Sequence, residues 1–321
     1  MKKIKVSFLW THDVRNSVIF KLFEKLSEGK IEFTKPDNCD LLIIGPYDNN
    51  SIKRRFLNYI KKKFKNSNIT FPNLETYSLN RKIKPLKLFF THENYSPAEF
   101  KYDFSITPNL GINDINHFRF PSWKDYIDWS HENIFRDSNV LNSKRFGSFY
   151  KIENLIESQG NKFLEKNRKF CMFTSHLNEP RKSMYLSFSK FFEVDGFGPY
   201  FDNSIKNHQT SNFFKKDIMN NYAFNLCPHN SLFPGYYEEK VPDAFLGKCL
   251  PITWADHNIQ YDFNKNAFVN LLDYTHNNYK EIIYLLKDDN FLRKFTDQPL
   301  LLSKPDLNQE IKFVKKIIDT L

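Results

Sequence analysis

Short apolar runs alternate with stretches of helical spacing along most of this 321-residue chain. The run from Cys39 to Gly45 is almost continuously apolar, which is typical of a strand buried in a parallel sheet. Ser17–Leu26 before it has apolar residues at helical spacing, and Lys87–Thr91 after it reads as another strand. Because parallel strands need crossover connections, this alternation predicts an α/β fold with helices on both faces of a parallel sheet.

A second series of the same kind begins at Lys169–Thr174, which also reads as a strand. A helix is expected over Pro180–Phe192 and a further strand near Glu193–Asp195. Between the two series, residues 121–161 lose the alternation and are rich in Trp, Asn and Ser. The chain is long enough for two domains of ordinary size, so we expect two consecutive α/β domains.

We place the first domain at residues 1–155 and the second at residues 156–300. The remaining segment, 301–321, is expected to form a C-terminal amphipathic helix. Its apolar residues recur at helical spacing from Leu307 to Leu321, and lysines lie on the opposite face. Another lysine-rich helix is expected over Ser51–Lys65.

The chain is strongly basic, with a formal net charge of +10 and a pI of about 9.2. Such a charge favours acidic partners: nucleotide diphosphates, nucleic acid or anionic lipid surfaces. Heavy use of Lys, Asn, Ile and Phe can give the same balance through compositional bias alone. No nucleic-acid-binding module is recognisable and the aromatic residues follow core periodicity, so no nucleic acid partner is expected.

The four cysteines, Cys39, Cys171, Cys227 and Cys249, form no C-x-x-C pair. A zinc site or a disulfide framework is therefore not expected, and buried free thiols fit a reducing compartment. No run of eighteen apolar residues exists, and Met1–Trp10 reads as a strand and not as a signal peptide. We expect a cytoplasmic protein. Its lysine-rich helix faces are either simply solvated or attached peripherally to the anionic inner face of the plasma membrane.

The segment from Tyr222 to Tyr274 is the most informative for function. It reads as a strand, a polar loop, a short helix, a second strand and a second loop. The charged and hydroxylated residues lie in the loops and at the start of the helix. A doubly wound sheet places its ligand at this kind of position.

This segment resembles the donor-sugar half of the bacterial α-1,3/4-fucosyltransferases, the family that uses GDP-fucose. The resemblance covers roughly residues 85–275. It implies the glycosyltransferase B (GT-B) architecture: two facing Rossmann-like domains, the first for the acceptor and the second for the GDP-sugar. It also implies an inverting enzyme that moves L-fucose from GDP-L-fucose to a hydroxyl group of a glycan acceptor, as in the synthesis of bacterial lipopolysaccharide or capsule.

Sugar transfer from a nucleotide diphosphate needs positive charge to stabilise the departing diphosphate. No D-x-D motif lies at a strand end, so neither a metal nor another cofactor is expected, and cationic side chains should take this role. Arg181 and Lys240, each at the start of a helix, are the leading candidates; the alternative is that they are solvated helix-end cations. The resemblance assigns nucleotide-sugar contacts to Arg181 and to a Tyr-x-x-Glu-Lys sequence, here Tyr236, Glu239 and Lys240.

Asn230 matches an Asn in the family's Phe-Glu-Asn-Ser segment, which implies a contact with the donor. The chain departs from the family on both sides of this residue. His229 replaces a Glu, and an insertion-like Leu232–Pro234 precedes Gly235. Both departures touch the donor site, and His229 is itself a candidate donor or acceptor contact.

Glu93 lies at the tip of the strand Lys87–Thr91, followed by Asn94. The corresponding family segment ends in Gly-Glu-Asn, and its Glu is the proposed general base. The resemblance therefore assigns to Glu93 the proton of the acceptor hydroxyl. His92 occupies a site that is usually glycine, which makes it a rival base or an acceptor contact, and Asn94 is a further candidate contact.

Two alternatives stay open. The fold and mechanism can be kept with a different GDP-linked donor sugar of the deoxy- or heptose type. The chain can also be a non-catalytic carbohydrate- or nucleotide-binding protein, although a pure binder would need no base such as Glu93. The expected partners are a GDP-sugar and a glycan acceptor, which can be lipid-linked.

Overall fold

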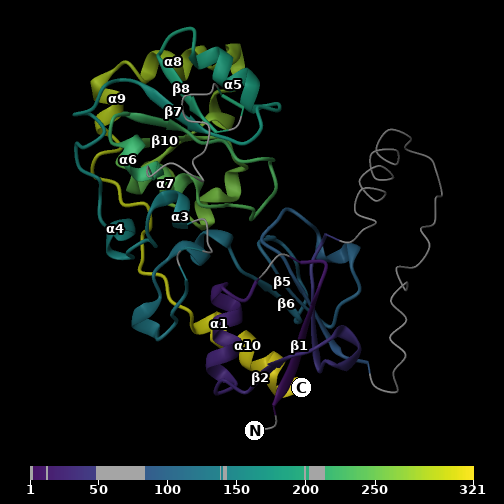
Figure 1. Cartoon of the computed structure of the whole chain (residues 1–321). Helices are drawn as coiled ribbons and strands as arrows, with labels where there is room; N and C mark the ends of the chain where they lie inside the picture. The colour runs from purple at the N-terminus through teal and green to yellow at the C-terminus, as the bar shows by residue number, and fades with distance from the viewer. Residues whose placement is uncertain are drawn as a thin grey trace, which may run out of the picture. The chain divides into compact units, whose positions relative to one another are not determined.

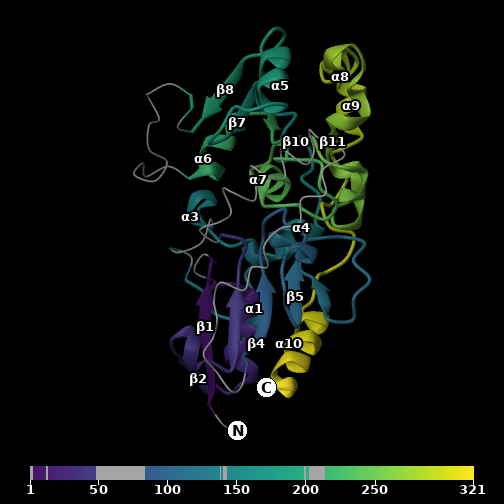
Figure 2. The same cartoon turned by 90° about the vertical axis from the view of Figure 1, so that its right-hand side faces the viewer.

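The computed structural model describes residues 3–11, 14–47, 84–137, 139, 143–198, 200–201 and 214–321. The helix expected over Ser51–Lys65 lies outside these residues. The described residues divide into two compact units (Figures 1 and 2). Unit 1 comprises Met1–Pro108, Ile112–Phe120 and Leu307–Leu321, and unit 2 comprises Asn109–Gly111 and Pro121–Asp306.

Unit 1 contains a parallel sheet in the order β2-β1-β3-β4-β5-β6. Its strands are β1 (Ile4–Leu9), β2 (Ile31–Phe33), β3 (Leu41–Ile44), β4 (Leu86–Phe90), β5 (Phe104–Thr107) and β6 (His117–Arg119). Helices α1 (Val18–Leu26) and α10 (Asn308–Thr320) lie on the same side of this sheet (Figure 1). Short 3-10 helices occupy Pro36–Asn38 and Pro97–Glu99.

Helix α10 is tied to unit 1 by its apolar face. Phe313, Val314 and Ile317 on this face are buried, and the helix packs against α1. The Phe313 ring contacts the rings of Phe104 and Phe118, with centroids 5.9 and 5.1 Å apart. An amphipathic helix folds by burying such a face, so the last described helix completes the core of the first unit.

Unit 2 contains a second parallel sheet in the order β11-β10-β9-β7-β8. Its strands are β7 (Phe170–Phe173), β8 (Val194–Phe197), β9 (Phe224–Leu226), β10 (Leu250–Thr253) and β11 (Val269–Asn270). Its α-helices are α3 (Ser143–Phe146), α4 (Glu153–Ile156), α5 (Arg181–Phe188), α6 (Lys215–Met219), α7 (Lys240–Leu246), α8 (Lys280–Leu285) and α9 (Asp289–Arg293). Its 3-10 helices are Ser122–Tyr126, Ser130–Glu132, His257–Tyr261, Lys265–Ala267, Leu271–Tyr274 and His276–Tyr279.

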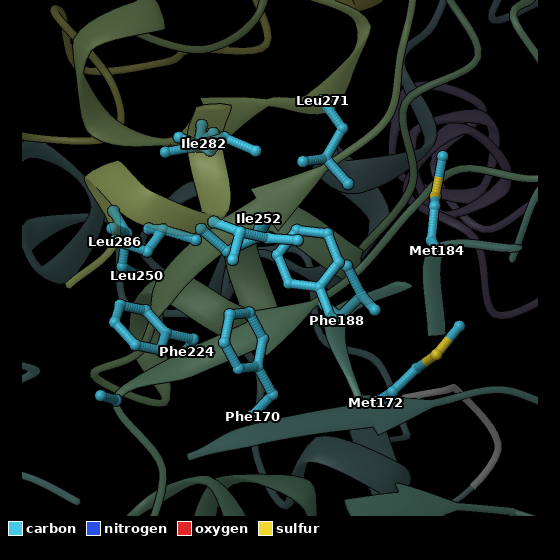
Figure 3. Close-up of a cluster of buried hydrophobic side chains, with 14 of the residues drawn as sticks. Phe170, Met172, Met184, Phe188, Phe224, Leu250, Ile252, Leu271, Ile282 and Leu286 are labelled. Carbon is cyan, nitrogen blue, oxygen red and sulfur yellow. The ribbon is translucent and has the colours of Figure 1, made fainter. Parts of the chain in front are cut away.

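The two faces of β7 bury different residues, as the alternation of a strand requires. Phe170 and Met172 join a large cluster with residues of β9, β10, α5, α8 and α9, shown in Figure 3. Cys171 belongs to a separate cluster with Met219 of α6. Both faces of the sheet are therefore covered, which confirms the predicted α/β class.

The boundaries of the compact units differ from the expected domains of residues 1–155, 156–300 and 301–321. Residues 121–155 pack with unit 2, where Ser122 donates a hydrogen bond to the carbonyl of Tyr237 (3.1 Å) and Trp123 to Asp262 (3.1 Å). The segment 301–321 is divided, and its helix belongs to unit 1. These contacts join residues far apart in the chain, and the local periodicity of the sequence cannot predict such contacts.

The four cysteines are free and buried, as expected. Among the described residues, no helix is long and apolar enough to cross a membrane.

Candidate functional site

The strand order of unit 2 reverses beside β7. The chain passes from β7 to β8 on one side of β7 and then to β9 on the other side. Strands β7 and β9 are therefore neighbours in the sheet, although β8 lies between them in the sequence. In an open parallel sheet, ligands bind outside the carboxyl ends of the strands at this point of reversal. The segments that follow β7 and β9 carry Arg181 and the residues from His229 to Lys240.

Arg181 is the first residue of α5 and is held by the segment that follows β7. Its Nη1 donates to Thr174 Oγ1 (3.1 Å) and to the carbonyl of His176 (3.2 Å). Partial burial lowers the pKa of Arg181, and the negative charges of Glu238 and Glu239 oppose this effect. A guanidinium group stays charged even so. The loop therefore fixes a cation at the end of β7.

Lys240 is the first residue of α7 and binds the loop that follows β9. Its Nζ donates to Asn230 Oδ1 (2.8 Å) and to the carbonyl of Pro228 (3.3 Å), and it forms an ion pair with Glu238 (3.1 Å). Asn230 in turn donates to the hydroxyl of buried Tyr236 (3.2 Å). The structure thus brings together three of the residues predicted for the donor site.

Glu239 lies directly before α7 and belongs to a buried ionic network. Lys215 of α6 is 2.8 Å from Asp243 and 3.5 Å from Glu239, measured from Nζ to the nearest carboxylate oxygen. Tyr150 donates to the other oxygen of Asp243 (2.6 Å). Burial raises the pKa of Asp243 to about 6, although Lys215 opposes the shift. Burial favours a neutral Lys215, but the charges of Asp243 and Glu239 outweigh it and raise the pKa of this amine above its usual value.

Lys215, Asp243 and Tyr150 were not among the site residues expected from the sequence. Asp243 offered one signal, because it is a carboxylate in the otherwise apolar stretch Val241–Leu246. A carboxylate in such a stretch is rarely buried unless it is paired. Lys215 offered none, since it is one of 47 Lys and Arg residues in the chain.

His229 is fully buried directly after the β9 segment. Burial lowers its pKa to about 3, and the nearby charges of Lys240 and Arg181 add to the effect. Neither ring nitrogen has a hydrogen-bond partner in the described part of the chain. The imidazole is therefore neutral near pH 7.

Glu93, His92 and Asn94 lie together in unit 1, in the turn after β4. The amide of Glu93 donates to Thr91 Oγ1 (3.0 Å), and its carbonyl accepts from the amide of Tyr95 (2.8 Å). Glu93 is half-buried and Asn94 is exposed. The His92 ring packs against Phe90 and Phe120, with centroids 4.9 and 5.9 Å apart. These three candidates thus belong to unit 1, and the other six belong to unit 2.

Among the described residues, no group of three or more His, Cys, Asp or Glu side chains is arranged to hold a metal ion. The cations that the described site offers to an anionic ligand are protein side chains, with Arg181 after β7 and Lys240 after β9. Two such groups can hold a diphosphate by charge-assisted hydrogen bonds.

Comparison with known proteins gives a family match in unit 2. Residues 163–297 match the model described as glycosyltransferase family 10 (fucosyltransferase) C-term. The chain is 27% identical over 220 residues to alpha-(1,3)-fucosyltransferase FucT of Helicobacter pylori, a match that covers 63% of this chain and 43% of that protein. The chain spans less than half the length of the curated relatives it matches.

Solved structures share this α/β fold. A crystal structure of an alpha1,3-fucosyltransferase with GDP-fucose has a TM-score of 0.66 at 20% identity, covering 99% of this chain and 91% of that one. A second alpha1,3-fucosyltransferase structure has a TM-score of 0.66 at 22% identity, with 99% and 90% covered. The matches confirm the family resemblance and the Rossmann-like α/β architecture of the GT-B glycosyltransferases.

Proposed function

We propose that this protein transfers L-fucose from GDP-L-fucose to a hydroxyl group of a glycan, because residues 163–297 match the C-terminal domain of the family 10 fucosyltransferases. One observation carries the proposal. The five residues expected at the donor, Arg181, Asn230, Tyr236, Glu239 and Lys240, all lie within the matched domain and follow β7 or β9 at the reversal of strand order.

On the donor side, Arg181 and Lys240 bind the diphosphate and stabilise its charge as it departs. Each is held in place by neighbouring loop atoms before any ligand arrives, so less ordering is required on binding. Glu239 accepts hydrogen bonds from hydroxyl groups of the sugar or the ribose. Tyr236 and Asn230 pack on the donor and keep Lys240 in position. No metal ion or other cofactor takes part.

On the acceptor side, Glu93 accepts the proton of the attacking hydroxyl. That oxygen then attacks the anomeric carbon from the face opposite GDP, so the configuration at this carbon is inverted. The position of Glu93 in a turn after β4, half-buried and held by Thr91, supports this role. His92 and Asn94 lie in the same turn and serve as contacts for the acceptor.

A different GDP-linked sugar, of the deoxy- or heptose type, is the second candidate for the donor. His229 favours this second candidate, because a neutral imidazole stands at a position where the family segment has Glu. Arg181 and Lys240 bind the diphosphate part of the donor, so they suit either sugar.

The acceptor in this proposal is a glycan, lipid-linked in bacterial lipopolysaccharide or capsule synthesis. The protein then works in the cytoplasm, in peripheral contact with the inner face of the plasma membrane. Lysines on the exposed face of α10, such as Lys312 and Lys315, support this part, because basic helix faces are attracted to anionic lipid.

Thermal shift with GDP, UDP, CMP and dTDP, with and without EDTA, tests the donor. GDP should stabilise the protein in both conditions, by about 2.7 kcal/mol at a hundred times the dissociation constant. Arg181→Ala and Lys240→Ala should each weaken GDP binding by about tenfold or more, because each removes a charge-assisted contact. Arg181→Lys should restore only part of the affinity, since Lys makes no planar bidentate contact.

Lys182→Ala serves as the matched control, because Lys182 is the exposed neighbour of Arg181 on α5. It should bind GDP like the wild type. Stabilisation by UDP alone, or only with added Mn²⁺, would contradict the proposed donor. Radiolabelled GDP-fucose, another GDP-linked deoxy sugar and a GDP-heptose then separate the donor candidates by transfer to glycan acceptors.

A further inference from the structure

The imidazole of His229 is enclosed without hydrogen bonds. Its exposed fraction is 0%, and neither Nδ1 nor Nε2 has a partner in the part of the chain that the structure describes. Buried polar groups in folded proteins are normally satisfied, and an unsatisfied one is unfavourable. A buried polar group without a hydrogen-bond partner in a native protein therefore calls for an explanation, and one explanation is a ligand that supplies the partner.

The backbone fixes His229 at the candidate site. Beyond β9, the amide of Cys227 donates to the carbonyl of Ile252 (2.9 Å) and the amide of His229 to that of Trp254 (3.1 Å). These two bonds continue the parallel pairing of the β9 segment with the β10 segment beyond the end of β9, as far as His229. The ring lies edge-on against Tyr237, with centroids 5.9 Å apart. The imidazole therefore has little freedom to turn away from its surroundings.

Both sequence neighbours of His229 contact Lys240, one of the two cations of the site. The Nζ of Lys240 contacts the carbonyl of Pro228 (3.3 Å) and Oδ1 of Asn230 (2.8 Å). The charges of Arg181, Lys240 and Glu239 all act on the His229 ring. The unpartnered imidazole thus belongs to the same group of residues as the proposed diphosphate contacts.

The chemistry of a neutral imidazole limits what it can bind. One ring nitrogen donates a hydrogen bond and the other accepts one. A diphosphate oxygen only accepts, and Arg181 and Lys240 already supply cations for it. A hydroxyl group both donates and accepts. The fucosyltransferases that this chain resembles have a Glu at this position, and an ionised Glu can only accept hydrogen bonds. His229 can therefore bind hydroxyl arrangements that a carboxylate at this position does not.

We propose that His229 is a specificity-determining residue of the donor site and that its imidazole hydrogen-bonds a hydroxyl group next to the diphosphate of a sugar nucleotide. The inference rests on the proposed function of unit 2 and deepens it. The hydroxyl belongs either to the transferred sugar or to the ribose, and the two sources predict different results.

Isothermal titration calorimetry with GDP, 2′-deoxy-GDP and GDP-fucose tests this inference. His229→Leu, which removes both hydrogen-bonding atoms, should weaken GDP-fucose binding about tenfold. His229→Gln keeps a donor and an acceptor and should stay within about threefold of the wild type. Cys227→Ala is the matched control, because it shortens another buried side chain only two residues before His229. It should bind like the wild type.

The ligand set distinguishes the two sources. If the hydroxyl belongs to the sugar, His229→Leu should lose affinity for GDP-fucose and keep its affinity for GDP. If the hydroxyl belongs to the ribose, the variant should lose affinity for both, and 2′-deoxy-GDP should bind the wild type and the variant equally. Equal binding of GDP and GDP-fucose by His229→Leu and the wild type would overturn the inference and leave the proposed function intact. A wild-type protein that binds none of the three ligands would overturn both.

A measurement on the wild type needs no variant to fold. The ¹⁵N chemical shifts of the His229 ring should be those of a neutral imidazole at pH 7. Adding saturating GDP-fucose should shift both ring nitrogens, because each gains a hydrogen bond. Unchanged ring shifts at saturation would contradict a direct contact.

Discussion

Glu93 lies in the turn after β4, in unit 1, and is the residue proposed to take the proton of the acceptor hydroxyl. Hydrogen bonds of its backbone to Thr91 and Tyr95 hold the turn, and the Glu93 side chain is half-buried at the end of β4. A general base needs such access, because it must approach the hydroxyl of an acceptor. The turn therefore positions the carboxylate without enclosing it.

Glu93→Gln should keep the fold and GDP affinity and should lower the transfer rate by about 10²- to 10⁴-fold, the usual contribution of a positioned base. The acidic limb of the wild-type pH–rate profile should disappear with the carboxylate. Glu99→Gln, an exposed change in the same unit, is the control and should transfer at the wild-type rate. If Glu93→Gln stays active and His92→Ala does not, His92 is the base.

The buried imidazole of His229 should make stability depend on pH. Its pKa is about 3 in the folded chain and 6.5 in the unfolded chain, so the unfolded chain binds the additional proton between these values. This contribution to stability is complete above pH 6.5 and is lost as the pH falls toward 3, by about 1.4 kcal/mol per pH unit. Asp243 acts in the opposite sense between about 3.8 and about 6, because its folded pKa is raised.

Comparison with His229→Gln separates the two effects, since Asp243 is present in both proteins. Urea unfolding at pH 7, 6 and 5 should show that the wild type loses stability relative to the variant below pH 6.5. Two parallel curves of stability against pH would mean that the imidazole is not buried in its neutral form.

At the residue scale, three of the candidate donor residues could be expected from the sequence to lie close together. Asn230, Tyr236 and Lys240 stand in a short stretch with a family pattern, and Asn230 contacts both of the other two. Tyr150, Lys215 and Asp243 are separated by up to 93 residues and meet only in the folded unit. No local pattern links them, so their network could not be read from spacing.

At the element scale, α6 and α7 are joined by that network, and its parts depend on each other. Removing one partner of a buried ion pair leaves the other charge uncompensated. Lys215→Met should therefore destabilise unit 2 by about 3–5 kcal/mol in urea unfolding. The double variant Lys215→Met, Asp243→Leu should recover part of this loss, because it removes the closest pair of charges but leaves Glu239 and Tyr150 without these partners. A double variant as unstable as the sum of its single changes would show that the pair is not coupled.

The strands were easier to predict than the helix ends. The expected strand Lys169–Thr174 contains β7, because a buried parallel strand has a distinct apolar run. The expected helix Pro180–Phe192 begins correctly but is longer than α5, which ends at Phe188. The apolar residues after Phe188 continue the pattern without continuing the helix. Strand order was not accessible from the sequence either, because it depends on pairing between distant segments.

At the scale of the whole molecule, α10 gives the clearest test of the two units. Val314 is fully buried in unit 1, so Val314→Asp places a charge without a partner in that core and should cost on the order of 3–5 kcal/mol. Hydrogen exchange should show lost protection in β1–β6 and retained protection in β7–β11. Lys315→Asp changes the charge at an exposed position of the same helix and should alter neither. Equal loss in both sheets would mean that the units unfold as one.

The membership of α10 in unit 1 also has a consequence for synthesis on the ribosome. Domains generally fold as units as the chain emerges from its N-terminal end. Here Phe313, Val314 and Ile317 emerge only after all of β7–β11. The later unit can therefore complete its core first, while the earlier sheet still exposes the apolar surface that α10 will cover. For this interval the nascent chain presents a patch suited to a chaperone, and a ribosome stalled before residue 307 would leave that patch open.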